Sequence, residues 1–303
     1  MGSAILRRRA AGLAAALPLL LGGCSAVVLA PSGDVAAQQR DLVVGSTILM
    51  LLIIVPVMAL TILFAWRYRA SNRDAHYEPD WDHSTHLELV IWAVPLLIII
   101  CLGALTWIGT HLLDPYRPLD RIDGHRAVAA DVQPLQVEAV ALDWKWLFIY
   151  PQYGIAAVNE LAAPVDRPIL FRITASTVMN SLAIPALAGQ VYAMPGMQTQ
   201  LHAIINAPGS YHGFSANYSG AGFSGMNFQF NGLAAADFER WIARAKSGGG
   251  ALDRATYLEL ARPSESVTPR TYAQADPTLF AAIVGMCVEA DKSCMAPMTG
   301  MSQ

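Results

Sequence analysis

The sequence is poor in charge. Only 14% of its 303 residues are Asp, Glu, Lys or Arg, whereas about 25% is usual for a soluble domain. This deficit argues against an ordinary cytosolic enzyme. A hydrophobic fraction of 54% and a mean hydropathy of +0.38 argue equally against a disordered chain. With Lys+Arg 20 against Asp+Glu 23, the net charge of −3 offers no basic field, so we expect no nucleic acid partner.

Cysteine is scarce as well. The four cysteines are Cys24, Cys101, Cys287 and Cys294, too few for a disulfide scaffold, and none lies between Cys101 and Cys287. The sequence also contains no Walker loop, dinucleotide fingerprint or nucleophile elbow. These absences give no support to a nucleotide-binding enzyme or an α/β-hydrolase.

The N-terminus has the pattern of a processing signal. Arg7–Arg9 precede an apolar run, Ala10–Leu21, which is too short to span a bilayer and ends in Leu21-Gly22-Gly23-Cys24. We predict a lipoprotein signal peptide over 1–23, a lipidated Cys24 and an external segment over 24–42. The alternative is a plain signal peptide with a chance cysteine.

Two later segments predict transmembrane helices, at 43–66 and 87–110. Val43–Trp66 and Leu89–Thr110 contain no Asp, Glu, Lys, Arg or His, and each is long enough to cross about 30 Å of hydrocarbon. Arginine counts are nearly tied around the second span, so the lipoprotein signal decides the orientation. The loop 67–86 is then cytoplasmic, and residues 111–303 lie outside.

The external part changes to short β-type runs punctuated by Gly and Pro, which favours a sandwich or barrel over about 111–232. Two helices are expected in an extension over 233–262, and Phe238, Trp241 and Ile242 share one face of the first. The tail, 263–303, shows only weak patterning. The expected strands are 135–142, 144–150, 168–174, 179–184, 198–206, 210–218 and 226–230.

Two spans before an external β-domain resemble subunit II of the haem–copper terminal oxidases, over about residues 24–262. Asp143–Pro151, with Trp144-Lys145-Trp146, looks like the family's aromatic segment. Val178–Pro185 matches the strand that carries a His-Ser pair in copper-bearing members, and Ala193–Thr199 looks like the turn that follows. The resemblance implies a cupredoxin-like sandwich after the transmembrane hairpin, with a short helical C-terminal extension.

The family's copper ligands have all been replaced here. In copper-bearing members the metal loop reads Cys-x-x-x-Cys-x-x-x-His-x-x-Met, and thiolates plus imidazole suit a copper electron-transfer site. The positions that match are Tyr218, Gly222, Met226 and Gln229, with Asn180 at the upstream histidine. The sequence therefore resembles the quinol oxidase branch, the bo-type enzymes. We expect no metal and no catalytic residue in this chain.

Glu88 opens the second span and has two compatible interpretations. Thr85-His86-Leu87-Glu88 fits a capping box, in which a carboxylate suits a helix N-terminus. The resemblance instead puts a glutamate here at the mouth of a proton-uptake path into subunit I, a role consistent with an ionisable group at the membrane surface.

Cys287 and Cys294 form a candidate disulfide, because an external compartment favours disulfides. Met286, Met295, Met298 and Met301 surround them, so Cu(I) binding by soft sulfur ligands stays open as the alternative. The resemblance does not extend to these cysteines.

These features together predict subunit II of a proton-pumping ubiquinol oxidase in a bacterial inner membrane. The resemblance implies haems and copper in subunit I, and subunits III and IV as further partners beside the lipid bilayer. Assembly and proton uptake would be this chain's roles. The alternatives are a membrane-anchored lipoprotein binding module and a copper-bearing cytochrome c oxidase subunit II.

Overall fold

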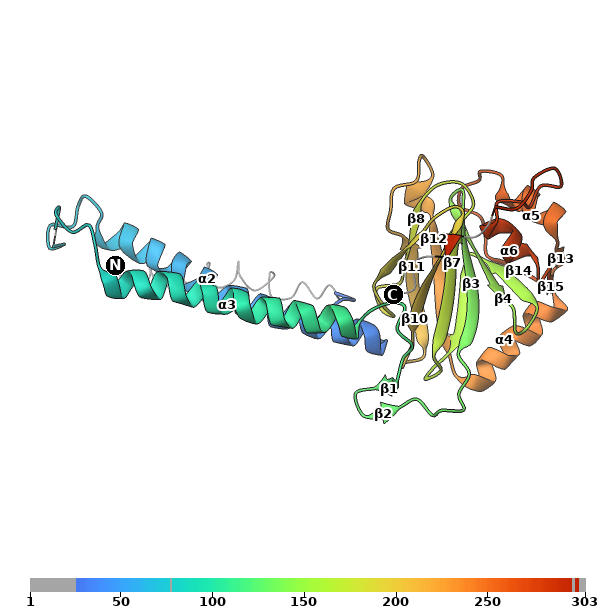
Figure 1. Cartoon of the computed structure of the whole chain (residues 1–303), viewed down its shortest axis with the longest axis horizontal. Helices are drawn as coiled ribbons and strands as arrows, with labels where there is room; N and C mark the ends of the chain where they lie inside the picture. The colour runs from blue at the N-terminus through green and yellow to red at the C-terminus, as the bar shows by residue number, and fades with distance from the viewer. Residues whose placement is uncertain (1–25, 77, 296–297, 300–303) are drawn as a thin grey trace, which may run out of the picture.

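The protein is a long helical hairpin that projects from a β-sandwich (Figure 1). The computed structural model describes residues 26–76, 78–295 and 298–299. The predicted signal peptide, 1–23, and the predicted lipidation site, Cys24, lie outside the described residues.

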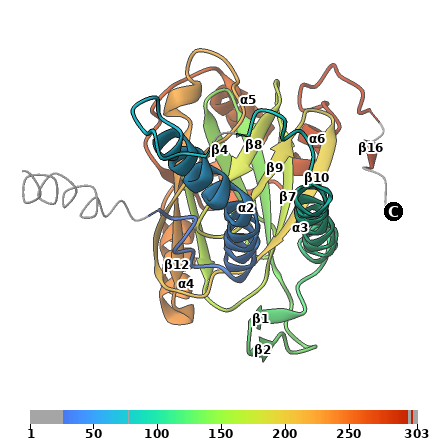
Figure 2. The ribbon, with the colours of Figure 1, turned by 90° about the vertical axis from the view of Figure 1, so that its left-hand side faces the viewer.

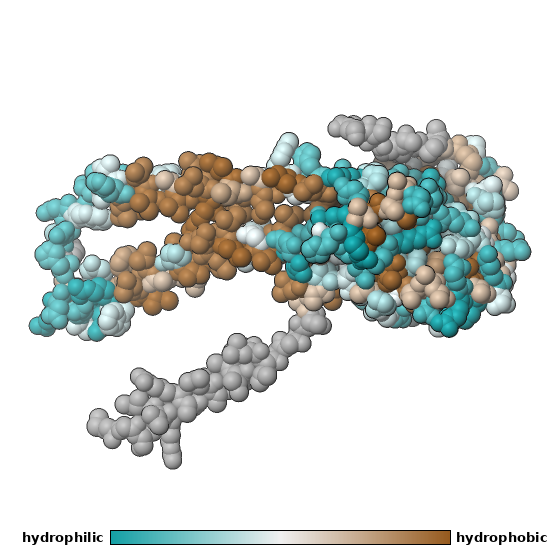
Figure 3. Space-filling model, turned by 90° about the horizontal axis from the view of Figure 1, so that it is seen from below, coloured by the Kyte–Doolittle hydropathy of each residue, from teal (hydrophilic) through white to brown (hydrophobic). Residues whose placement is uncertain are grey.

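The hairpin consists of α2 (Asp34–Arg67) and α3 (Thr85–Leu112), both long and apolar enough to cross a membrane. The helix α2 begins at Asp34, well before the predicted span at Val43, and continues as one rod down to Arg67. Pro56 and Pro95 lie inside these helices, as membrane helices tolerate. A hydrophobic band covers the hairpin and ends at hydrophilic residues on both sides (Figure 3).

Small residues let the two helices approach each other. A Cβ at Gly109 of α3 would lie 2.7 Å from Cδ1 of Leu42, and one at Gly45 of α2 would lie 3.8 Å from Cδ2 of Leu105. Glycine at such positions allows close packing of membrane helices. Large side chains elsewhere on the hairpin point outward.

The external domain is a sandwich of two sheets. One has the order β14-β5-β4-β3-β7-β10-β16 and the other β6-β12-β11-β8-β9. Two short pairs, β1-β2 and β13-β15, lie beside them. The bounds are β1 Arg121–Asp123, β2 Arg126–Ala127, β3 Leu135–Leu142, β4 Lys145–Tyr150, β5 Ile155–Val158, β6 Glu160–Pro164, β7 Ile169–Ala175, β8 Asn180–Ala183, β9 Gln190–Ala193, β10 Met197–Ala203, β11 Gly209–Ser215, β12 Asn227–Leu233, β13 Ala251–Leu252, β14 Arg270–Tyr272, β15 Gln274–Ala275 and β16 Met298–Thr299.

Strand β3 shows why the chain folds into layers. Because side chains alternate along a strand, Leu135, Val137 and Ala139 enter the core between the sheets. Val140 and Leu142 face the other side and join a second core. The C-terminal segment covers this outer face.

Helix α4 (Ala235–Ser247) packs on the core between the sheets, and the C-terminal segment that follows it contains α5 (Arg254–Ala261) and α6 (Leu279–Val284). The face of α4 predicted to be apolar is buried, and it carries Phe238, Trp241 and Ile242. The prediction of a weakly structured tail over 263–303 is wrong for a large part of that range. Strand β14 pairs with β5, and α6 buries its apolar residues on the outer face of the larger sheet, because that face needs a cover.

The hairpin is joined to the sandwich at the end where α2 begins. Figure 2 looks along the hairpin toward the sandwich and shows both helices over the edge formed by β9 and β10. The backbone N–H groups of Ser32 and Gly33 donate to the Ala186 carbonyl at 2.9 and 2.8 Å. A Cβ at Gly33 would lie 2.5 Å from the Leu187 carbonyl oxygen, so only glycine allows this approach. The predicted class, a two-helix hairpin before an all-β sandwich, is confirmed.

Candidate functional site

The loop between β11 and β12 is the one expected to match the metal loop of copper-bearing relatives, with its ligands replaced. It contains the 3₁₀ turn η1 (Phe223–Gly225) and approaches the turn between β3 and β4. That β-turn is two residues long, Asp143-Trp144, and Trp144 has a φ of 65°. The left-handed backbone directs its indole toward the loop.

The Trp144 indole fills the centre of this loop. Its Nε1–H donates to the Ser219 carbonyl at 3.1 Å, and a Cβ at Gly222 would lie 2.4 Å from Cδ2 of the same ring. Gly222 is therefore required by packing. A cysteine at this position would displace Trp144, so the geometry does not fit a thiolate ligand.

Asn180, at the upstream histidine position, is buried at the start of β8. Its Oδ1 accepts a hydrogen bond from Ser215 Oγ at 2.9 Å, and its Nδ2 donates to the Val178 carbonyl at 3.1 Å. Both ends of the amide are thus bound to protein groups. Asn180 bridges β8 and β11 as a structural residue.

The other former ligand positions do not converge on one point. Met226 is buried in the core between the sheets, whereas Tyr218 is 75% exposed and packs its ring against Phe223. Gln229 points outward from β12 and donates to Ser210 Oγ. Across the described part of the chain, no group of three or more His, Cys, Asp or Glu side chains could hold a metal ion. The residues present do not fit the dinuclear copper of the family.

Aromatic side chains pack below the loop, an arrangement that the sequence pattern did not reveal. Phe228 of β12 lies 4.9 Å from Phe148 and 5.9 Å from Trp146 of β4, measured between ring centroids. Phe228 covers Gly213 of β11, where a Cβ would lie 2.2 Å from its Cζ. The signal that could have indicated this contact is a glycine across the strand pair from an aromatic residue.

Glu88 lies in the first turns of α3, at the far end of the hairpin from the sandwich. Its Oε1 is 2.7 Å from Nδ1 of His83, and Nε2 of the same imidazole is 3.1 Å from Thr85 Oγ1. The predicted capping box is wrong, because the N-cap is Ser84 and no side chain caps it. Glu88 is 52% exposed, so its carboxylate is open to solvent.

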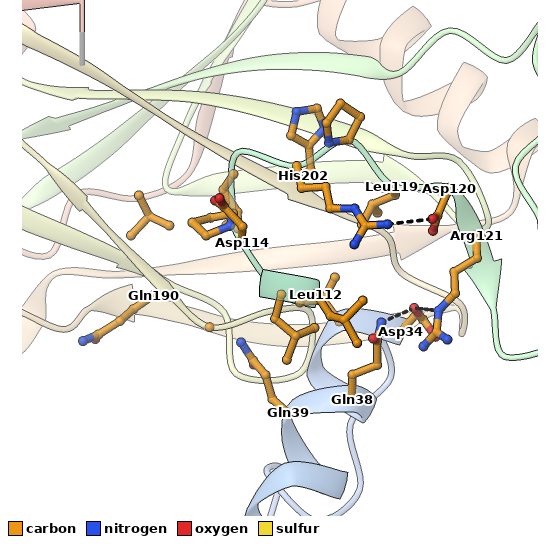
Figure 4. Close-up of a pocket in the computed structure, with 18 residues that line it drawn as sticks. Asp34, Gln38, Gln39, Leu112, Asp114, Leu119, Asp120, Arg121, Gln190 and His202 are labelled. Carbon is orange, nitrogen blue, oxygen red and sulfur yellow. Dashed lines mark hydrogen bonds and ion pairs between the residues drawn. The ribbon is translucent and has the colours of Figure 1, made fainter. Parts of the chain in front are cut away.

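An ion pair between a buried aspartate and a partly exposed arginine connects the hairpin to the sandwich. Asp34 accepts from Arg121 Nε at 2.8 Å and Nη2 at 3.1 Å, and also from Gln38 Nε2 at 2.7 Å (Figure 4). The Asp34 side chain is 5% exposed. The two charges are far apart in sequence, so no local pattern could have paired them.

Two further ionisable groups are buried in the outer face of the larger sheet. Burial raises the pKa of Glu138 to about 7, against the opposing effect of Arg172, whose Nη1 is 3.8 Å away. Burial lowers the pKa of Lys145, although nearby Asp143 opposes this. Lys145 Nζ donates to the Arg262 carbonyl at 2.8 Å and to Ser264 Oγ at 2.7 Å, so it ties β4 to the C-terminal segment.

Cys287 and Cys294 are joined by a disulfide, with their Cα atoms 4.7 Å apart. Cys287 is buried beside α6, and the Met295 N–H donates to the Gly285 carbonyl at 2.9 Å. The bridge closes a short loop at the end of the C-terminal cover.

The chain has a helical hairpin followed by a cupredoxin-like sandwich, and the copper ligands of its metal loop are replaced. This combination places it in the class of oxidase subunit II. Residues 151–232 match the family described as cytochrome c oxidase subunit II, periplasmic domain. Residues 246–291 match the COX aromatic rich motif, so the resemblance extends past residue 262, where it was expected to end. This match includes Cys287.

Relatives that match most of the chain identify the branch of this class to which it belongs. It is 50% identical to the cytochrome bo(3) ubiquinol oxidase subunit 2 of Pseudomonas putida, over 88% of this chain and 82% of that protein. It is 48% identical to the ubiquinol oxidase subunit 2 of Acetobacter aceti, over 91% and 87%. It is 37% identical to the quinol oxidase subunit 2 of Bacillus subtilis, over 84% and 77%. The chain belongs to the quinol oxidase subunit 2 family of the haem–copper oxidases.

Proposed function

We propose that this chain is subunit II of a proton-pumping ubiquinol oxidase in a bacterial inner membrane, and that it holds no redox centre. Ubiquinol would be oxidised and oxygen reduced to water in subunit I, which would carry the haems and copper. Subunits III and IV would complete the complex.

The observation that carries the proposal is the metal loop. Its two thiolate positions are Tyr218 and Gly222, and the Trp144 indole occupies the space over Gly222. A copper electron-transfer site needs soft thiolate ligands, which this loop does not supply. Electrons from a quinol dissolved in the bilayer have no need of an external copper, so the fold can persist without its metal.

Support of the complex is the first role we assign to the chain. The hairpin presents exposed apolar residues such as Leu89, Trp92 and Ile99, which need lipid or partner helices around them. Charged residues are also sparse in the external domain, and the cores of partner interfaces are depleted in charge. Both features favour a subunit that lies against a larger neighbour.

Proton uptake at Glu88 is the second role. The carboxylate is half exposed and in contact with the His83 imidazole, so the pair can accept a proton from water at the membrane surface. We place this end of the hairpin on the cytoplasmic side, with the sandwich periplasmic. A diacylated Cys24 would add a lipid anchor near the start of α2.

Purification through a tag on this chain tests the proposal. We expect haem-containing partners and oxygen uptake that depends on ubiquinol and not on reduced cytochrome c. A chain that purifies alone would instead indicate a free-standing lipoprotein binding module. Oxygen uptake driven by cytochrome c would favour a copper-bearing subunit.

A further inference from the structure

A cavity lies where the hairpin meets the sandwich, away from the metal loop and from Glu88. Its volume is about 380 Å³, within the roughly 300–1,000 Å³ range of ligand pockets. Residues from α2, the segment after α3, β9 and β10 line it, among them Asp34, Gln39, Asp114, Gln190 and His202 (Figure 4).

The cavity continues into two apolar grooves between the helices. One groove, of about 540 Å³, shares Gln39 and Leu113 with the cavity, and the other, of about 360 Å³, shares Gln38 and Arg121. The grooves are lined by apolar residues of both helices, including Leu42, Val43, Met50, Leu105 and Ile108. The combined space is polar at one end and apolar along the other, which is the shape of an amphiphile.

Neighbouring residues place the polar end at the depth of lipid headgroups. Trp107 and His111 of α3 pack at 4.4 Å between ring centroids, and Trp107 is exposed in the way of an interfacial aromatic. On α2, Arg40 and Asp41 are the last charges before the uncharged run that starts near Val43. The cavity therefore opens where hydrocarbon gives way to headgroups.

The charged side chains around the cavity indicate which kind of lipid headgroup fits it. Two arginines, Arg117 and Arg121, face three aspartates, Asp34, Asp114 and Asp120. Arg121 is held by Asp34 at 2.8 Å, and Arg117 by Asp120 at 3.0 Å. Within the described residues Asp114 takes part in no ion pair, and its Oδ1 accepts the Tyr116 N–H at 2.9 Å. The remaining charge is thus one carboxylate, which disfavours an anionic lipid and favours a cationic ammonium.

We infer that this cavity binds one aminophospholipid, such as phosphatidylethanolamine, with its ammonium on Asp114, its phosphate beside Arg117 and an acyl chain in the larger groove, which Ser46 and Leu105 line. The lipid fills the joint between membrane hairpin and external domain. It replaces water at a place where polar backbone and apolar helix surface meet.

Native mass spectrometry of the whole oxidase complex tests this inference. The complex is purified through a tag on this chain and equilibrated with equal amounts of phosphatidylethanolamine, phosphatidylcholine, phosphatidylglycerol and ubiquinol. The chain is then released, and the molecules that stay on it are identified. We expect wild-type chain to retain one phosphatidylethanolamine in preference to the other three.

Two variants act on different ends of the site. Asp114→Asn keeps the acceptor for the Tyr116 N–H but removes the charge, so the preference for phosphatidylethanolamine over phosphatidylglycerol should fall about fivefold or more. Ser46→Trp fills the groove and should reduce retention of every phospholipid. Asp131→Asn, at an exposed aspartate outside the cavity, is the matched control and should change nothing.

Retention of phosphatidylglycerol or ubiquinol in place of phosphatidylethanolamine would overturn the inference. Equal retention by wild type and both variants would overturn it as well. Haem content and oxygen uptake of the same preparations report on the proposed function separately.

Discussion

At the scale of single residues, the loop is explained by the packing around Gly222. Gly222 has ordinary backbone angles, with φ −86° and ψ 7°, so its lack of a side chain is not a requirement of the backbone. Its neighbours require it instead, since a Cβ would lie 2.4 Å from Cδ2 of Trp144 and 2.7 Å from Cγ of Glu265. The same packing that stabilises the loop prevents it from holding a thiolate.

The first prediction concerns this packing. Gly222→Ala should destabilise the folded chain by about 1–3 kcal/mol, the usual cost of overpacking, because the ring must move. Gly225→Ala is the matched control, since only Ser266 Oγ would be near its Cβ, at 3.9 Å. Chemical denaturation measures both. Trp144→Ala should remove the part of the cost that the indole causes, while the contact with Glu265 Cγ remains; additive effects of the two changes would contradict the Trp144 contact.

The second prediction concerns Glu88. Glu88→Ala should slow proton uptake and oxygen consumption of the assembled enzyme, because it removes the carboxylate that we propose collects protons. Glu78→Ala provides a control in the same loop, since Glu78 also lies beside a histidine, His76, at 3.0 Å. Stopped-flow proton uptake in assembled enzyme is the measurement. Unchanged turnover in the Glu88 variant would remove its proton role.

The third prediction follows from Glu138. Its pKa in the folded chain, about 7, lies above the ordinary value of 4.5, so the folded state holds the proton more tightly than the unfolded state. The contribution of Glu138 to the free energy of unfolding should therefore be greatest below pH 4.5 and should be lost as the pH rises through about 7, by on the order of 3 kcal/mol. Glu138→Gln should lose this dependence. Unfolding free energies from pH 4 to 8 that fall equally in both proteins would contradict it.

At the scale of elements, α2 acts as a single rod that joins membrane and external domain. Its first turn is buried against the sandwich through Val35 and Ala36, and Asp34 pairs with Arg121, the first residue of β1. A rigid connection of this kind transmits the position of the hairpin to the sandwich.

The fourth prediction tests that joint. Arg121→Ala leaves the buried Asp34 carboxylate with only its Gln38 partner, and should cost about 1–3 kcal/mol of unfolding free energy, since Arg121 itself is 40% exposed. Arg240→Ala breaks an exposed pair with Asp237 on α4 and should cost less than about 1 kcal/mol. Asp34→Asn combined with Arg121→Ala should recover part of the loss. A double-mutant cycle with no coupling would show that the joint rests on backbone contacts alone.

The same elements show how far sequence reasoning reaches. Hydrophobic runs predicted both membrane helices, and alternation predicted β3, because these patterns are local consequences of burial. Strands β5, β6 and β9 were missed. The first two strands are rich in alanine, as in Ile155-Ala156-Ala157-Val158 and Leu161-Ala162-Ala163. Alanine has a low strand propensity, and tertiary packing overrides that propensity here.

The candidate site was likewise predictable from the sequence in part only. The identity of the replaced ligands was readable from spacing, since a missing cysteine is visible in the sequence alone. The position of the Trp144 ring over Gly222, the Glu88–His83 contact and the Asp34–Arg121 pair depend on long-range or rotamer geometry. None of these has a periodic signature.

At the scale of the whole molecule, the chain combines three layers of cover. The hairpin exposes apolar side chains that lipid or partner helices would cover, the two sheets cover each other, and the C-terminal segment covers the outer sheet face through its own core. Lys145 and the Cys287–Cys294 bridge fasten that segment. A sandwich supported in this way does not depend on a metal for its structure.

The copper content of the full-length chain tests the central claim most directly. The chain is purified in detergent, incubated with copper and reductant, dialysed, reoxidised with ferricyanide and then examined by metal analysis and electron paramagnetic resonance. The account predicts no copper bound at the 218–229 loop and no spectrum of a thiolate-bridged dinuclear centre, with unchanged results for Trp144→Ala. A dinuclear copper signal in the wild-type chain would contradict it.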